Sequence, residues 1–321
     1  MKCQEDPTSR CEEKLERWVA KNASAALAQV QGTLRTLSER KFWCDHPRRG
    51  HVDFLEGQLT PLHGIVLVEH FQGRIPLAGN FPTEHRGIPI SYFTTNDFLN
   101  VVDQLRAFPE IAQYLDERHQ QLPQECLRAA GGEGVLFDHY ILRNGRFEGW
   151  TIYSEIELEL AKHKAEVQAC LKTKAKADRD AYLIEYVADQ LSQRGLDPKA
   201  DLPPDLPAHV DPPDKRTAYL KMQEHLCDLP LSDRRSLGAQ FKAVFDKLHQ
   251  SNSHTEFIFG AVWADSKPGF VFVLASSRNV LRTEVLNRTW VLLRAALTHY
   301  GKAAGMAITD RDGGSFEVAL I

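Results

Sequence analysis

The longest amphipathic segment of the chain lies near its N-terminus and limits the folds that the chain can adopt. Between residues 12 and 40, apolar side chains recur every three or four residues. They are Leu15, Trp18, Val19, Ala23, Ala26, Val30, Leu34 and Leu37. This spacing places them in one stripe on a helix, and the stripe has to be covered by other apolar residues. Because the middle of the segment is rich in alanine, we expect the helix to lie close against a sheet.

Two apolar runs supply candidate strands for that sheet. Residues 64–68 form a continuous apolar run between polar residues, which is typical of a strand buried on both faces. A second strand is expected at residues 88–93. Thr94, with Asp97 three residues later, has the pattern of a helix N-cap, and Pro109 suits the first turn of another helix. Strands and helices in this order indicate an α/β layer.

The rest of the chain divides at a proline-rich segment. Residues 154–196 have helical spacing and are locally basic, whereas residues 197–214 hold six of the 16 prolines among five aspartates. The latter composition favours an extended, solvated connector. Alternating apolar residues then predict strands on either side of one helix, in the order β-β-α-β-β. These elements are expected at residues 257–263, 269–275, 281–300, 306–309 and 316–321.

We therefore predict the fold class α+β, with an α/β-like N-terminal layer, a helical middle and a C-terminal β-β-α-β-β unit. The glycine-rich residues 131–134 lack the lysine of a phosphate-binding loop and are expected to form a turn. The predicted segments are residues 1–125, 126–196, 197–214 and 215–321.

Composition excludes several classes of protein. The chain has 43% hydrophobic residues and a formal net charge of -4, so it is neither wholly disordered nor surrounded by a field that attracts polyanions. No run of about 18 apolar residues is present, and the first residues lack the apolar core of a signal peptide, so we expect a cytoplasmic protein without a membrane partner. The six cysteines form no C-x-x-C pair, which argues against a zinc ribbon.

One pattern of residues near the N-terminus suggests chemistry. Metal-dependent DNA cleavage uses acidic ligands for Mg²⁺ and a lysine that positions the attacking water. The chain begins with Lys2 and continues into a helix that carries Gln29 and Gln31. In this stretch it resembles the PD-(D/E)xK nuclease superfamily, in particular its nuclease-related (NERD-like) branch, over residues 1–40 and more weakly to about residue 122.

The resemblance implies a restriction-endonuclease-like fold and assigns roles to three residues. Lys2 matches the catalytic lysine, and Gln29 and Gln31 flank the position of the supporting glutamine. The Asp and Glu of the motif have no counterpart, since they would precede Met1. We therefore expect a truncated or degenerate member of the family, without nuclease activity or a cofactor as given. Mg²⁺ is expected only for a longer form that supplies both carboxylates.

Residues 42–51 contain Pro47 and Gly50 and are expected to form a loop. Basic residues in and before this loop are candidate contacts to DNA phosphates. They are Arg40, Lys41, Arg48 and Arg49. The same region carries candidate metal ligands, but their spacing matches no established pattern and no metal site is predicted. These residues are Cys44, Asp45, His46, His51 and Asp53.

Two other functions remain open from the sequence. The chain could be an uncharacterised cytosolic interaction or regulatory protein that binds a protein partner through its β-β-α-β-β unit, with no nucleic-acid chemistry. It could also be a hydrolase that uses the Asp- and His-rich loop around His46. DNA and a protein partner are thus the two partners that the sequence suggests.

Overall fold

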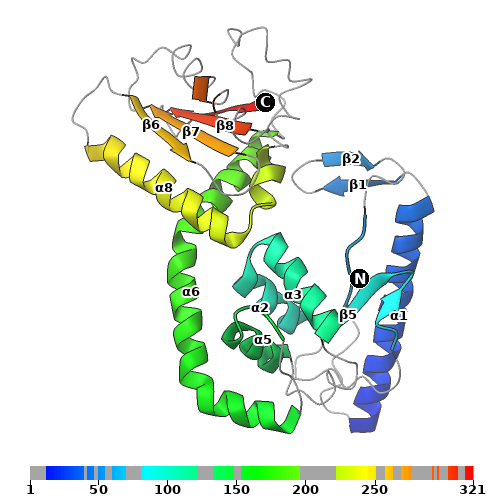
Figure 1. The fold of residues 1–321 in the computed structure, drawn as a ribbon. Helices are drawn as coiled ribbons and strands as arrows, with labels where there is room; N and C mark the ends of the chain where they lie inside the picture. Colours follow the sequence, from blue (N-terminus) through cyan, green and yellow to red (C-terminus); the bar gives the residue numbers. More distant parts are fainter. Residues whose placement is uncertain are drawn as a thin grey trace. The chain divides into compact units, whose positions relative to one another are not determined.

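The chain forms two compact units of mixed helix and strand. Unit 1 comprises residues 1–44 and 52–174, and unit 2 comprises residues 45–51 and 175–321. The computed structural model describes residues 12–39, 42–46, 50–54, 60–69, 81–121, 133–147, 153–195, 222–250, 257–262, 269–275, 291–292, 295, 303–309 and 315–320 (Figure 1).

The sheet of unit 1 has the strand order β3-β5-β4. Strands β3 (Gly64–Val68) and β5 (Ile88–Thr94) are parallel, with Gly64 opposite Ile90 and Val68 opposite Thr94. The short strand β4 (Glu84–His85) is antiparallel to β5. Arg86 and Gly87 join β4 to β5 with φ angles of 52° and 79°, and two positive φ angles in a row are the geometry of a tight two-residue hairpin turn.

Helix α1 (Glu12–Glu39) packs on one face of this sheet, as the apolar stripe predicted (Figure 1). Gly64 allows this packing, because a Cβ atom there would lie 2.8 Å from Cγ1 of Val30 on α1. The expectation of a sheet against the long helix is therefore confirmed. The buried residues of this interface are Ala23 and Leu27 from α1 and Val66, Val68, Ile90 and Tyr92 from the strands.

Three further helices build a second core, which includes Phe93 of β5. They are α2 (Thr95–Leu105), α3 (Phe108–Gln121) and α5 (Glu133–Leu142). The predicted N-cap is confirmed, because the Thr94 hydroxyl accepts a hydrogen bond from the Asp97 backbone N–H at 3.0 Å. The buried residues of this core are Phe93, Val101, Leu105, Tyr114, Leu115, Leu136, Phe137, Tyr140 and Phe147.

Three local expectations were wrong. Residues 42–51 are not a loop throughout, because β1 (Phe42–His46) and β2 (Gly50–Phe54) form a two-stranded sheet. Aromatic and β-branched residues in these strands favour extended backbone, and Pro47 follows β1 instead of interrupting it. Residues 133 and 134 begin α5 and are not part of a turn. Strand β3 is not buried on both faces along its length, since Leu67 is 43% exposed.

Unit 2 contains the second part of α6 (Tyr153–Gly195) and α8 (Leu231–Gln250). The helix-rich structure expected for residues 154–196 is confirmed. Arg235 of α8 donates a hydrogen bond through Nε to Oδ1 of Asp178 on α6 at 2.7 Å. The two helices approach so closely at Gly238 that a Cβ atom there would overlap the carbonyl group of Asp180.

The sheet of unit 2 has the strand order β6-β7-β8-β9. Its outer pairs are antiparallel and the central pair, β7 with β8, is parallel. Four strands were predicted here, and the described residues of unit 2 include four in this sheet. Most of the helix predicted at residues 281–300, and the connector at residues 197–214, lie outside the described residues. The strands are β6 (Phe257–Val262), β7 (Gly269–Ala275), β8 (Ala303–Thr309) and β9 (Ser315–Leu320).

Candidate functional site

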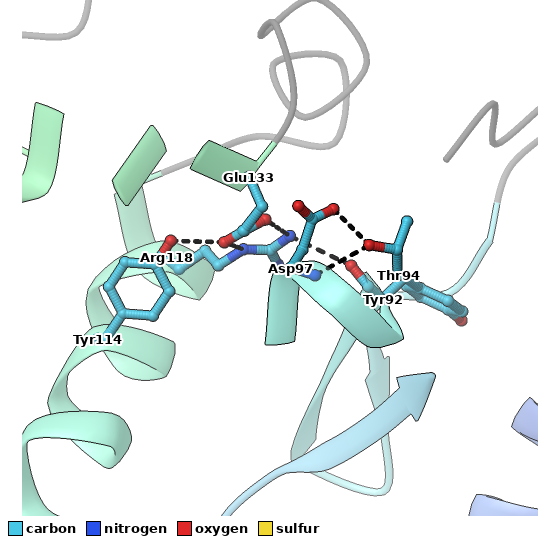
Figure 2. Close-up of polar contacts among 6 residues, drawn as sticks. All are labelled: Tyr92, Thr94, Asp97, Tyr114, Arg118 and Glu133. Carbon is cyan, nitrogen blue, oxygen red and sulfur yellow. Dashed lines mark hydrogen bonds and ion pairs between the residues drawn. The ribbon is translucent and has the colours of Figure 1, made fainter. Parts of the chain in front are cut away.

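A network of polar side chains lies at the carboxyl end of β5, between α2, α3 and α5 (Figure 2). At its centre, Arg118 donates from Nε to Oε1 of Glu133 and from Nη2 to Oε2, each at 2.9 Å. The hydroxyl of Tyr114 donates to Oε1 of Glu133 at 2.5 Å. Both members of the ion pair are buried, with side chains 5% and 6% exposed. We call Thr94, Asp97, Tyr114, Arg118 and Glu133 the Arg118 network.

Local structure explains how these residues meet. Tyr114 and Arg118 are four residues apart on α3 and so share one face of that helix. Glu133 is the first residue of α5, where the helix dipole favours a carboxylate. The guanidinium carbon of Arg118 lies 4.5 Å from the centre of the Phe93 ring, and Nη2 of Arg118 donates to the Tyr92 carbonyl at 3.4 Å. Arg118 thus ties α3 to both α5 and β5.

Burial and charge shift the pKa values within the network in different directions. Burial, the largest single cause, would lower the pKa of Arg118, but the charge and hydrogen bonds of Glu133, together with Tyr114 and Asp97, outweigh it and the pKa is raised. Burial, reinforced by Glu133, raises the pKa of the Tyr114 hydroxyl. Burial also raises the pKa of Asp97; Glu133 adds to this, whereas the hydrogen bond from Thr94 and the charge of Arg118 oppose it.

The hydrogen bonds determine what the network can do chemically. Each carboxylate oxygen of Glu133 already accepts at least one strong hydrogen bond, so a metal ion or a substrate proton would have to displace Arg118 or Tyr114. The ion pair therefore acts as a structural anchor. Asp97 differs, because it is only partly buried, has a raised pKa and lies where parallel sheets often bind ligands. It is the acid of the network best placed to exchange a proton with a ligand.

A second polar pair joins the start of β3 to α3. Nε2 of His63 lies 3.0 Å from Oδ1 of Asp116, and the His63 side chain is 5% exposed against 58% for Asp116. Nδ1 of His63 is buried and makes no hydrogen bond to a described residue. Burial lowers the pKa of His63 below its ordinary value of 6.5; Asp116 opposes this shift and His119 adds to it. The imidazole is therefore held neutral at neutral pH.

We expect this histidine to make stability depend on pH. The folded protein binds a proton at His63 less tightly than the unfolded chain does. The contribution of neutral His63 to the free energy of unfolding is therefore complete above about pH 6.5 and is lost as the pH falls toward the lowered pKa. Urea unfolding gives the free energy of unfolding at about pH 7.5 and about pH 5. This free energy should fall more for the natural protein than for His63→Gln, which keeps a donor for Asp116 but does not titrate. Equal losses in the two proteins would contradict this assignment.

Neither of the two glutamines predicted from the sequence belongs to the Arg118 network. Gln29 is exposed and Gln31 is half-buried on α1. Lys2, Arg40, Lys41, Arg48 and Arg49 lie outside the described residues, and so do the side chains of the five candidate metal ligands around His46. Among the described residues, no group of three His, Cys, Asp or Glu side chains is arranged to hold a metal ion.

No family model, curated protein or solved structure matches the chain. In the part of the chain that the structure describes, no helix has both the length and the apolar character needed to cross a membrane.

Proposed function

We propose that unit 1 is a restriction-endonuclease-like α/β layer that binds duplex DNA without cleaving it. The observation that supports this most is the order of its elements. The glutamine-bearing helix α1 packs on the parallel strands β3 and β5, and α2 follows β5 directly. This is the order that the resemblance implies for the part of the fold that follows the catalytic lysine.

The proposal of binding without cleavage is supported by the acidic residues that the structure describes. Among them, no group of three His, Cys, Asp or Glu side chains is arranged to hold a metal ion. Glu133, a buried acid at the carboxyl end of the sheet, is fully engaged by Arg118 and Tyr114. Without dedicated ligands for Mg²⁺, a contribution of several kcal/mol to the transition state is missing. Lys2, Gln29 and Gln31 would support a metal centre only in a form that supplies both carboxylates.

Salt-dependent binding to a labelled duplex tests this function. We expect measurable binding at low salt, and we expect the quadruple change of Arg40, Lys41, Arg48 and Arg49 to alanine to weaken it. The slope of log affinity against log salt concentration is negative. If each of the four residues contacts one phosphate, the magnitude of this slope should decrease by about 3.6 in the variant. A matched control removes four exposed cations elsewhere, by changing Lys14, Lys21, Lys162 and Lys164 to alanine.

Cleavage or a failure of specific duplex binding would overturn the proposal. The first is Mg²⁺-dependent cleavage of plasmid DNA by the purified 321-residue protein. The second is an absence of duplex binding at low salt, or an equal loss of binding in the control variant.

A second function is favoured by exposed apolar side chains in unit 1. Leu99 on α2 and Phe108 on α3 are 56% and 58% exposed. Large apolar groups at a surface often mark sites of contact with other proteins. If duplex DNA does not bind, an interaction or regulatory protein in the cytoplasm becomes the preferred function, with these two side chains as the first positions to substitute.

A further inference from the structure

The part of α6 that belongs to unit 2 has one buried and one exposed side. The buried residues recur every three or four positions and face the interior of unit 2, where Asp178 binds Arg235. They are Asp178, Ala181, Ile184, Val187 and Ala188. Between residues 175 and 189, the exposed residues are Ala175, Lys176, Arg179, Tyr182 and Tyr186. We call the last four of these the α6 face.

The exposed charge on this segment is entirely positive. Lys176 and Arg179 are exposed, whereas the four acids of the same segment are buried or half-buried. Those acids are Asp178, Asp180, Glu185 and Asp189. The α6 face is therefore suited to an anionic partner even though the whole chain carries a net charge of -4.

Two tyrosines adjoin the positive charges. Tyr182 is 42% exposed and Tyr186 is 58% exposed, and their spacing of four residues makes them neighbours on the helix surface. Arg179 lies three residues before Tyr182 and so shares the same side of the helix. Arg179 and the two tyrosines therefore lie on one side of α6.

We propose that the α6 face binds single-stranded nucleic acid. Bases stack on the rings of Tyr182 and Tyr186, and phosphates contact Lys176 and Arg179. Exposed aromatic rings beside basic side chains are the combination used for unpaired strands, because every base offers a face for stacking. A partner helix is less suited, since the exposed residues between 175 and 189 include no Leu, Ile, Val or Met for it to pack against.

Fluorescence anisotropy with a labelled thymidine oligonucleotide tests the proposal on the full chain. Changing Tyr182 or Tyr186 to alanine should weaken binding by about 5-fold to 150-fold for each ring, whereas phenylalanine should preserve it. Changing Lys176 and Arg179 together to alanine should decrease the magnitude of the slope of log affinity against log salt concentration by about 1.4. The control is Lys162→Ala with Lys164→Ala, which removes the same charge from an exposed part of α6 that lies in unit 1 and should leave binding unchanged.

Several results would overturn the proposal. These are no binding of the oligonucleotide, equal binding by the tyrosine-to-alanine variants, or an equal loss in the control. Tyrosine-dependent binding of a polyglutamate peptide without binding of the oligonucleotide would instead identify a protein-docking surface. The proposal does not depend on duplex binding by unit 1, because neither tyrosine substitution alters the residues tested there. Circular dichroism of each variant confirms that α6 is intact, which is expected because alanine favours helix.

Discussion

Replacing Arg118 with methionine is expected to lower the free energy of unfolding of unit 1 by about 3 to 5 kcal/mol. Methionine can still lie over the Phe93 ring, so apolar contact is largely retained. The charge of Glu133, however, remains buried, and the Tyr114 hydroxyl is its one remaining hydrogen-bond partner among the described residues. The cost arises mainly from this uncompensated buried charge, not from the lost attraction itself.

A double variant separates these two contributions. Adding Glu133→Gln to Arg118→Met removes the buried charge and keeps an amide oxygen as acceptor for Tyr114. We expect most of the lost stability to return, because replacing both members of a buried ion pair is often close to neutral. Urea unfolding gives the free energies, and hydrogen exchange in α2, α3 and α5 assigns the change to unit 1. If the double variant is as unstable as the single one, burial of the unpaired charge is not the cause.

Changing Gly238 to alanine is expected to destabilise unit 2 by about 1 to 3 kcal/mol or more. The new Cβ atom would overlap the Asp180 carbonyl on α6. Backbone cannot move aside as a flexible side chain can, so α8 has to separate from α6, and the Arg235 to Asp178 contact is strained as well. Thermal unfolding measures the loss, and hydrogen exchange in α8 locates it.

The matched control for Gly238 is Gly32 on α1. A Cβ atom at Gly32 would meet nothing within 4 Å, so Gly32→Ala should stabilise its helix by about 0.5 to 1 kcal/mol. The changes in the free energy of unfolding are therefore expected to have opposite signs for Gly238→Ala and Gly32→Ala. A stabilising effect at Gly238 would mean that α6 and α8 are not in close contact at that point.

Local sequence signals predicted much of unit 1. The stripe on α1, the apolar run of β3 and the cap at Thr94 each depend on residues that are neighbours in the chain, and helical or strand periodicity is sufficient to find them. Periodicity also predicted the four strands of unit 2. Periodicity does not show which strand lies at the edge of a sheet. The exposure of Leu67 on the edge strand β3 was therefore not predicted.

The Arg118 network could not be predicted in this way. Helical spacing places Tyr114 and Arg118 on one face, but nothing in the sequence indicates that Glu133 lies beside them, since this contact depends on the packing of α5. The glycines at positions 131 and 132 also suggested a turn where α5 begins. The members of the Arg118 network, Asp97 included, were assigned no functional role from the sequence. The exposed tyrosines of α6 were missed because the solvent side of a long helix is visible only once its buried side is known.

The parallel pairing at the centre of the unit 2 sheet has a consequence for folding kinetics. Strands β6 and β7, and strands β8 and β9, are close in sequence and can pair through short connections. By contrast, β7 ends at residue 275 and β8 begins at residue 303, so this parallel pair joins segments that are far apart in sequence. Because loop closure must precede the contacts that stabilise the pair, we expect the pairing of β7 with β8 to be the slow step in assembling the C-terminal sheet.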